Sequence, residues 1–526
     1  MESPSLADCT GFIRTWREEC IANHARCREL STARGYEEGR FTPTRLVDVG
    51  SQDTAPYVYE HRRSGPLGGP PPAYVALSHC WGRSPIIRTT KAAYEEHQRA
   101  IPWSHLSKTF QDAITITREL GIGYIWIDSL YIVQDDDEDW EREAVQMAQV
   151  YQGAFVTLAS TSAPGGEAGM LNQQSRTEKV VVDGGGKPST VYARRAIDHR
   201  GFFRPGEPSE RNLPLLGRGW TFQEQLLSPR IVHFTEEELI WDCYEGLFCE
   251  CGNGKDWFVS KSDFARALLE PSTQSRTWRG LVSHYIGRVL TYDKDRLPAI
   301  SSLAGQLEAS SGLGRYLAGL WEADLPFNLL WRVEAGTGRR PSYRDARGMQ
   351  PPTWSWTSIE CPTLAWAWSE HDDDPEAQAE VLEVSCRPAT SDPRGMVLGG
   401  QLVLRSRLYP VVLQSVHEPR WVYLRSYNQL QGSKTVCSIK PDVPLGSPGM
   451  DIDEGEMLFF LPISAGRRDW NWYHGLLLRC VGDRDSSLPS RSGGSHIDFH
   501  CRRLGYGTID FRETRQIFDD KVVLIT

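Results

Sequence analysis

Short runs of consecutive apolar residues alternate with helical patterns in the first half of the chain. The runs at 74–78, 124–127 and 154–158 predict strands covered on both faces, because a strand with one wet face would alternate apolar and polar residues. Their β-α-β-α-β order predicts a parallel sheet with right-handed crossovers. We therefore expect a three-layer α/β unit over residues 73–245, with sites at the carboxyl ends of its strands.

Two amphipathic helices are predicted between these strands. Ser107 can cap the first helix. Its apolar face comprises Phe110, Ala113, Ile114 and Thr117. The second follows the acidic run Asp135–Asp139, which capping and the helix dipole explain, and which lacks the Gly and distal Glu of an EF-hand calcium loop. The predicted apolar stripe of this helix comprises Trp140, Ala144, Met147, Ala148 and Tyr151.

The remaining chain divides by composition and pattern. Three segments are rich in Gly and Pro or in acids and predict linkers or loops: Arg62–Pro72, Gly184–Gly186 and His371–Glu380. The expected divisions are an N-terminal leader and linker at 1–72, the α/β domain at 73–245 with its core motifs at 73–230, a helical region at 258–350, and a β-rich C-terminal region at 351–526.

Composition and charge narrow the classes of function. The 526 residues are 40% hydrophobic and 24% charged, which is typical of globular proteins, and the net charge is -10 without a basic stripe, so no nucleic-acid partner is expected. No apolar run is long enough for a membrane span, and Met1–Trp16 lacks the apolar core of a secretory signal. Because the 12 Cys are scattered, we expect mostly reduced thiols and a cytoplasmic location.

The end of the first strand carries Ser78, His79, Cys80 and Trp81. A Cys beside a His suggests a nucleophile, but neighbouring residues on a strand point to opposite faces, so His79 cannot readily activate Cys80. The alternative is a polar turn packed under Trp81. We take Ser78, His79 and Trp81 as candidate substrate-binding residues.

Two carboxylates follow the second strand. Asp128 closes that strand, where it can hold a ribose hydroxyl or a cation, or cap the next loop. Glu143 shares a helix face with the apolar stripe, three residues after Trp140, so it needs a partner or a raised pKa. Glu143 is therefore a candidate base or substrate ligand, or half of a buried salt bridge, for instance with Arg218.

A third acid repeats the pairing of Trp with a carboxylate. Glu224 lies one helical turn after Trp220 and close in sequence to Arg218. Two such acids could form a dyad or share an arginine clamp. The predicted catalytic residues are thus Asp128, Glu143 and Glu224, with Trp140, Arg218 and Trp220 binding substrate. We expect Asp128, Glu143, Arg218 and Glu224 to converge on one cleft at the carboxyl edge of the sheet.

Metal ligation is not expected from the sequence. Cys243, Cys249 and Cys251, with His233 upstream, match no standard ligand spacing, and reduced thiols explain them better. The chain has no Walker-type phosphate loop and no G-x-S-x-G elbow. The sequence motifs therefore do not indicate which cofactor the protein would bind.

Three ordered segments carry a family resemblance. The segments Tyr74–Gly82, Tyr124–Tyr151 and Gly217–Arg230 resemble the opening, central and closing motifs of the fungal heterokaryon-incompatibility (HET) domain. Leu290–Ala299 and Pro352–Trp356 resemble downstream signatures of long family members. One position departs from the pattern, because Tyr131 stands where the family usually has Cys.

The resemblance implies a role in vegetative incompatibility, in which fused fungal cells of unlike genotype die. It implies a flavodoxin-like fold related to Toll/interleukin-1 receptor (TIR) domains, some of which cleave NAD with a helical glutamate comparable to Glu143. It also implies an incompatibility partner protein, a nucleotide or other small-molecule substrate, or a homo-oligomer. The alternatives are a non-catalytic interaction module and a biosynthetic enzyme for a small apolar metabolite.

Overall fold

In the computed structural model the chain forms two compact units, Met1–Glu270 and Pro271–Thr526. The described residues are 5–34, 41–61, 72–171, 177–183, 188–194, 199, 212–252, 260–309, 312–334, 338–341, 350–367, 376–417, 421–426, 437–447, 450, 452–453, 455–465, 472–481, 497–510 and 518–526. The linker predicted at Arg62–Pro72 (except Pro72), the Gly184–Gly186 loop and residues 371–375 of the acidic segment lie outside them.

A mixed eight-stranded sheet forms the centre of the first unit, in the order β10-β9-β8-β5-β3-β4-β1-β2. Its strands are β1 (Arg45–Asp48), β2 (Tyr57–Glu60), β3 (Tyr74–Ser78), β4 (Tyr124–Trp126), β5 (Val156–Ala159), β8 (Arg230–Phe234), β9 (Leu239–Cys243) and β10 (Leu247–Cys249). The four central strands, β4, β3, β5 and β8, are parallel, and parallel pairing was predicted for the first three of them. Strands β8, β9 and β10 pair antiparallel, because the short turns between them can join only antiparallel neighbours. At the other edge, β1 pairs antiparallel with both β2 and β4.

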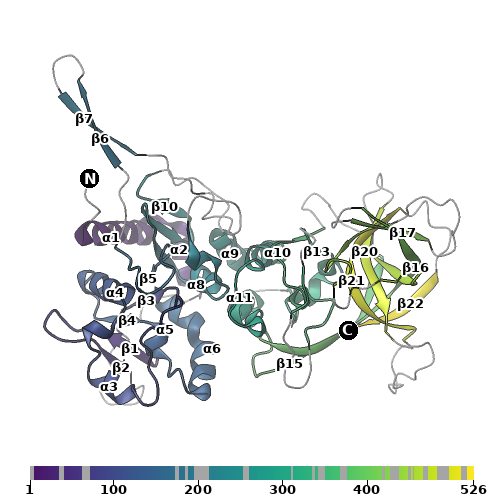
Figure 1. The fold of residues 1–526 in the computed structure, drawn as a ribbon, viewed down its shortest axis with the longest axis horizontal. Coiled ribbons are helices and arrows are strands. Elements are labelled where there is room, and N and C mark those ends of the chain that lie inside the picture. The colour runs from purple at the N-terminus through teal and green to yellow at the C-terminus, as the bar shows by residue number, and fades with distance from the viewer. Residues whose placement is uncertain are drawn as a thin grey trace. The chain divides into compact units, whose positions relative to one another are not determined.

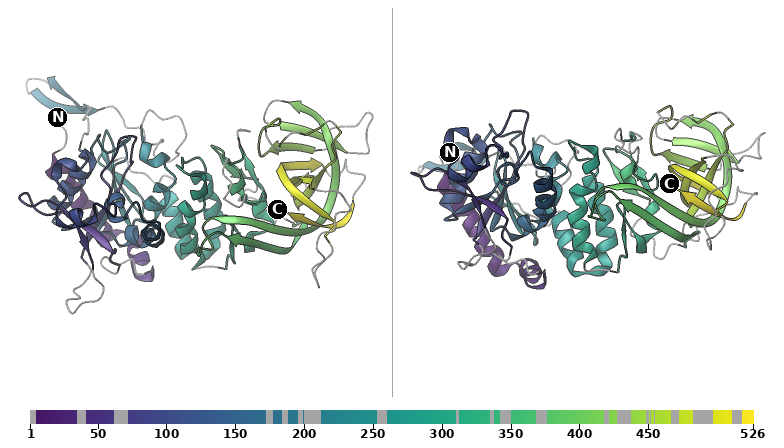
Figure 2. Two further views of the ribbon diagram at one scale, coloured as in Figure 1. Left: turned by 60° about the horizontal axis from the view of Figure 1, so that its bottom comes forward. Right: turned by 90° about the horizontal axis from the view of Figure 1, so that it is seen from below.

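Helices cover both faces of this sheet. They are α1 (Leu6–Asn23), α2 (Ala25–Arg34), α3 (Tyr94–Arg99), α4 (Lys108–Glu119), α5 (Asp128–Tyr131), α6 (Asp137–Gly153), α8 (Thr221–Leu227) and α9 (Ser260–Leu269). Because β4 and β5 lie on opposite sides of β3, right-handed crossovers send α4 and α6 to opposite faces. Accordingly α4 packs with α1, and α6 packs with α8 (Figures 1 and 2).

Local sequence signals predicted both crossover helices, and one residue was assigned to the wrong helix face. Ser107 caps α4 by accepting a hydrogen bond from Phe110 N, as predicted. Asp136 likewise caps α6. The predicted apolar stripe of α6 is wrong at Trp140, which is 44% exposed. The buried face of this helix instead carries Asp139 and Glu143, because Arg45 supplies a partner for both acids there.

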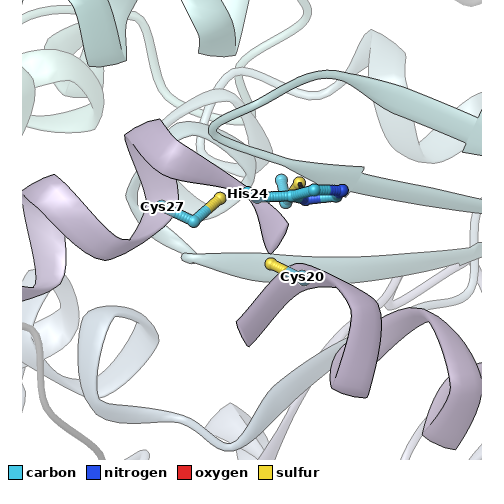
Figure 3. Close-up of side chains that lie close together, drawn as sticks. Cys20, His24 and Cys27 are labelled. Carbon is cyan, nitrogen blue, oxygen red and sulfur yellow. Dashed lines mark hydrogen bonds between the residues drawn. The ribbon is translucent and has the colours of Figure 1, made fainter. Parts of the chain in front are cut away.

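The segment predicted as a leader supplies part of the first unit. Strand β1 pairs with both β2 and β4, and its residues Leu46 and Val47 are buried. Helices α1 and α2 meet at His24, where the chain leaves helical geometry for one residue. The side chains of Cys20, His24 and Cys27 point into one small region at this junction (Figure 3). Residues 5–34 and 41–60 thus contribute strands and helices to the α/β unit.

The second unit begins with two helices, α10 (Gln274–Tyr285) and α11 (Pro298–Glu308), and continues mainly with strands. Its main sheet has the order β15-β16-β17-β18-β21-β20-β19, with β22 pairing to β16 and β21. These strands are β15 (Ala379–Pro388), β16 (Val397–His417), β17 (Trp421–Ser426), β18 (Cys437–Pro441), β19 (Leu458–Ala465), β20 (Trp472–Cys480), β21 (Phe499–Asp510) and β22 (Phe518–Ile525). The β-rich C-terminal pattern agrees with the sequence.

Short strands replace helix in the second half of the region predicted as helical. They are β11 (Tyr316–Leu317), β12 (Leu320–Trp321) and β13 (Trp331–Val333), and β13 pairs with β14 (Leu364–Trp366). Several Trp residues in these strands and elsewhere in the second unit are fully buried: Trp278, Trp321, Trp331, Trp354 and Trp356. Within the described residues, none of the helices combines the length and apolar character needed to cross a bilayer.

Candidate functional site

The carboxyl ends of β3 and β4 lie at a topological switch point of the sheet. The chain leaves β3 toward α4 on one face and leaves β4 toward α6 on the other. In open α/β sheets, neighbouring strands whose connections diverge in this way mark the usual ligand site. Ser78 ends β3, and Asp128 begins α5 one residue beyond the end of β4, so the sheet itself brings these two predicted residues together.

Glu224 reaches this position from α8. Ser78 Oγ donates a hydrogen bond of 2.6 Å to Glu224 Oε2, although the two residues are 146 positions apart in sequence. Glu224 is only 7% exposed. Burial raises the pKa of Glu224 to about 7, while the Ser78 hydrogen bond and the nearby Arg218 act in the opposite direction. Near neutral pH this carboxyl can therefore either donate or accept a proton.

Asp128 is more exposed to solvent than Glu224. Its side chain is 28% exposed, and Trp81 Nε1 donates a 2.8 Å hydrogen bond to Asp128 Oδ2. The Nε2 atom of His79 lies 3.8 Å from Asp128 Oδ1 and has no hydrogen-bond partner among the described residues. Burial lowers the pKa of His79, so the ring is neutral at pH 7 and can donate or accept one hydrogen bond.

Arg218 and Tyr151 complete the group. Arg218 Nη1 donates a 2.5 Å hydrogen bond to the carbonyl oxygen of His79. Tyr151 lies on the buried side of α6, and burial raises its pKa well above the usual value, beside both Glu224 and Asp128. We call this set the switch-point cluster: Ser78, His79, Trp81, Asp128, Tyr151, Arg218 and Glu224. The sequence pattern gave Tyr151 only a packing role, so its place near the acids was missed.

Cys80 lies in the apolar interior of the unit. Its side chain is buried with Ala159, Leu215 and Ile231 in an apolar cluster. Burial raises the pKa of the thiol, which disfavours the thiolate needed for nucleophilic attack. His79 packs edge-on against Phe110 instead. The neighbouring side chains therefore pack against different partners, as the strand geometry predicts.

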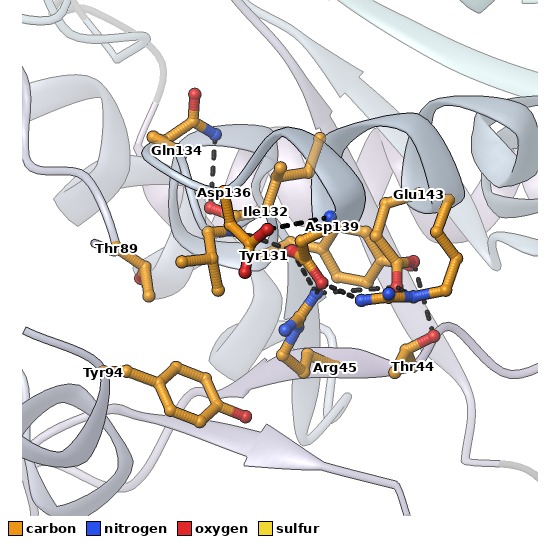
Figure 4. Close-up of polar contacts among 12 residues, drawn as sticks. Thr44, Arg45, Thr89, Tyr94, Tyr131, Ile132, Gln134, Asp136, Asp139 and Glu143 are labelled. Carbon is orange, nitrogen blue, oxygen red and sulfur yellow. Dashed lines mark hydrogen bonds and ion pairs between the residues drawn. The ribbon is translucent and has the colours of Figure 1, made fainter. Parts of the chain in front are cut away.

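Glu143 lies in a different cluster, which we call the Arg45 network: Thr44, Arg45, Tyr131, Asp139, Arg142 and Glu143 (Figure 4). Arg45 Nη2 lies 2.6 Å from Asp139 Oδ2 and 3.5 Å from Glu143 Oε1. Tyr131 donates a short hydrogen bond to Glu143, and Thr44 Oγ1 donates another of 3.3 Å.

The Arg45 network balances two acids against two guanidinium groups. Arg45 is buried, whereas the side chain of Arg142 is 54% exposed. The partner of Glu143 is therefore Arg45, not Arg218 as the sequence suggested. Tyr131, which stands where the family usually has Cys, is one of its hydrogen-bond donors. Both oxygens of the Glu143 carboxylate are engaged within the network.

The two predicted Trp residues occupy unlike positions. Trp220 is half-buried at the start of α8, one turn before Glu224. Trp140 is exposed at the start of α6. The structure thus gathers Ser78, His79, Trp81, Asp128, Arg218 and Glu224 at the switch point, with Trp220 at the start of the helix that carries Glu224. Glu143 and Trp140 are placed elsewhere.

Two groups of possible metal ligands occur among the described residues. One comprises Cys20, His24, Cys27 and Cys243, and the other His199, Glu238, Cys249 and Cys251. The three cysteines considered together in the sequence are therefore divided between two groups, and His233 bonds Thr161 instead. The spacing C-x3-H-x2-C at 20–27 was the sequence signal that could have identified the first group.

The raised pKa of Glu224 predicts a specific dependence of stability on pH. A carboxyl whose pKa rises from 4.5 unfolded to about 7 folded binds its proton more tightly in the folded state. Its contribution is fully present below pH 4.5 and is lost as the pH rises through about 7. We expect this loss, roughly 3 kcal/mol, to disappear in Glu224→Gln. Urea unfolding of the N-terminal unit across this pH range checks it, with exposed Glu95→Gln keeping the wild-type profile.

The comparisons with known proteins agree with the motif pattern. Residues 74–224 match the family model described as Heterokaryon incompatibility protein (HET). No curated protein and no solved structure matches the chain. The matched segment runs from the first residue of β3 to Glu224, so it contains every residue of the switch-point cluster. The chain therefore contains a HET domain, at residues 74–224.

Proposed function

We propose that this chain acts in fungal self/non-self recognition and programmed cell death through a nucleotide-directed reaction at the switch-point cluster. One observation carries the proposal: a buried carboxyl that titrates near neutral pH, Glu224, lies beside a partly exposed carboxylate, Asp128. Two acids in unlike environments are the usual arrangement for separate acid-base and charge-stabilising roles. Their place at the switch point of a parallel sheet supports a nucleotide as ligand.

Cleavage of NAD fits these groups chemically. The bond between ribose C1′ and the nicotinamide nitrogen breaks, and nicotinamide leaves as a neutral molecule with the bonding electrons. Asp128 stabilises the positive charge that develops on the ribose, as carboxylates do in glycoside hydrolysis. Water adds to C1′, and its proton passes to ionised Glu224. Arg218 supplies a positive charge for the pyrophosphate.

Glu143 is less suited to this role than Glu224. Its oxygens accept hydrogen bonds from Tyr131, Thr44 and Arg142 within a charge-balanced network. A substrate would have to displace these partners to reach the carboxylate. The resemblance to TIR enzymes suggests Glu143 from its helix position, whereas the contacts of Glu224 favour the switch-point cluster.

Purified full-length chain tests the proposal directly. NAD loss and nicotinamide release are measured with the chain alone and with the chain fused to a ligand-induced dimerisation domain. We expect consumption of NAD with one nicotinamide released per NAD consumed, and faster turnover on forced association. No NAD loss in either state, by a chain that kills cells when expressed, would contradict the reaction.

An interaction module is the second candidate function. It is favoured by the exposed side chains of Trp140 and Val145 on α6, which are 44% and 71% exposed. Exposed aromatic residues are typical of protein-protein contact surfaces. Such a module would bind an incompatibility partner or a second copy of the chain. It would kill cells without consuming NAD, so the same assay separates the two functions.

A further inference from the structure

Three thiols and one imidazole meet in the interior of the first unit. The ligand atoms of Cys20, His24, Cys27 and Cys243 all lie within 4.8 Å of one another. His24 Nδ1 is 3.2 Å from Cys243 Sγ. In a tetrahedral zinc site with bonds of about 2.0–2.3 Å, neighbouring ligand atoms are roughly 3.5–3.8 Å apart. The cluster is therefore of the size that one ion needs.

The local fold builds this arrangement from distant parts of the chain. Cys20 is in the last turn of α1, and Cys27 is in the first turn of α2. His24 lies between the helices in extended conformation, which lets all three side chains converge (Figure 3). Cys243 ends β9 and brings the fourth ligand from 219 residues away. The ring of His24 is held by stacking on Phe248 at 4.9 Å.

All four ligands are protected from water, and none of the 12 cysteines, all of which are described, forms a disulfide. Cys20 and Cys243 are fully buried, and His24 and Cys27 are 8% exposed. Four apolar residues would fill this space more simply than three thiols around an imidazole. A Cys3His set matches the ligands of structural zinc sites, which are closed to solvent and tetrahedral.

The surrounding charges suit a bound ion. Zinc with three thiolates and a neutral imidazole carries one net negative charge. Two cations lie beside the cluster: Arg230 interacts with Cys20, and Lys261 with the sulfur atoms of Cys243, Cys27 and Cys20. The Lys261 side chain is fully buried, and its Nζ donates to Asp242 O at 3.0 Å. Asp242 Oδ2 also lies 3.9 Å from Lys261 Nζ, so Lys261 and Arg230 together offset the charges of the zinc cluster and of this carboxylate.

We propose that Cys20, His24, Cys27 and Cys243 bind a structural zinc ion that holds helices α1 and α2 against strand β9. The ion joins the segment before the matched family region to the strand after it. Three of the four ligands come from the part of the chain that was predicted to be a leader. Zinc binding is thus coupled to folding of the first unit and independent of any reaction at the switch-point cluster.

Metal content of the full-length chain provides the test. The chain is purified from zinc-supplemented cells, dialysed against metal-free buffer and measured by elemental mass spectrometry. Because His199, Glu238, Cys249 and Cys251 could hold an ion of their own, the readout is the difference from wild type. We expect His24→Ala and Cys243→Ser to carry one zinc per chain fewer than wild type. His24→Cys, which keeps four ligands, should retain the wild-type content.

Two measurements on the wild-type chain keep the proposal testable even if the variants misfold. Cobalt added to metal-depleted wild-type chain should give the visible absorption of a tetrahedral thiolate site, and a strong chelator should lower its melting temperature. Cys9→Ser is the matched control, because Cys9 is a buried thiol on the same helix outside the cluster. A wild-type chain without zinc, or His24→Ala and Cys243→Ser with the same zinc content as Cys9→Ser, would overturn the proposal.

Discussion

Replacing Arg45 with Met is expected to lower the free energy of unfolding of the N-terminal unit by about 3–5 kcal/mol. Arg45 is the one fully enclosed cation of its network, with its side chain 6% exposed, and it faces Asp139 and Glu143, which are 4% and 0% exposed. Met fills a similar volume but leaves two buried carboxylates with Arg142, which is half exposed, as the only cation of the network. Urea unfolding followed by fluorescence measures the loss.

A double mutant separates unpaired charge from lost packing. Arg45→Met combined with Asp139→Asn removes a cation and an anion together, so it should be less destabilised than the two single changes added. Arg99→Met is the matched control, because Arg99 forms an exposed pair with Glu95 and should change stability by less than about 0.5 kcal/mol. An Arg45→Met chain as stable as this control would show that the Arg45 network does not stabilise the domain.

Replacing Glu224 with Gln is expected to lower NAD turnover by about 10²–10⁴-fold, the usual contribution of an acid-base group. Gln keeps the shape of the side chain and can still accept the hydrogen bond from Ser78. It cannot take a proton from water, so chemistry is lost while binding is retained. Steady-state kinetics should therefore show a large fall in kcat with little change in KM.

The pH profile of turnover provides the control for this variant. Wild-type activity should rise with pH as Glu224 ionises near pH 7. Glu95→Gln, an exposed acid outside the cluster, should keep the wild-type rate and profile. An unchanged kcat in Glu224→Gln would show that Glu224 does not take part in the reaction.

Hydrophobic pattern and local caps were sufficient to predict the core of the HET domain. Strands β3, β4 and β5 coincide with runs of apolar residues, and parallel pairing follows from their β-α-β order. Ser107 caps α4 as its position suggested. Short edge strands were missed, because β1 and β2 have four residues each and lack a long apolar run.

Long-range polar contacts explain the remaining differences between the structure and the predictions made from the sequence. Helical spacing placed Glu143 on a buried face correctly, and the residue is fully buried. The same spacing cannot decide whether Trp140 or Asp139 shares that face, since the choice depends on Arg45, 94 residues earlier. Contacts between Ser78 and Glu224 or between His24 and Cys243 are equally invisible to local pattern, because they join residues 146 and 219 positions apart.

Cell death on overexpression, compared between Glu224→Gln and Glu143→Gln at matched levels of folded protein, tests the central claim most directly. The claim is that the HET domain acts through the switch-point cluster and that Glu143 supports the fold. We therefore expect Glu224→Gln to be fully folded and harmless. Glu143→Gln should be less stable but as toxic as wild type for each folded molecule. A harmless, fully stable Glu143→Gln beside a toxic Glu224→Gln would contradict this assignment.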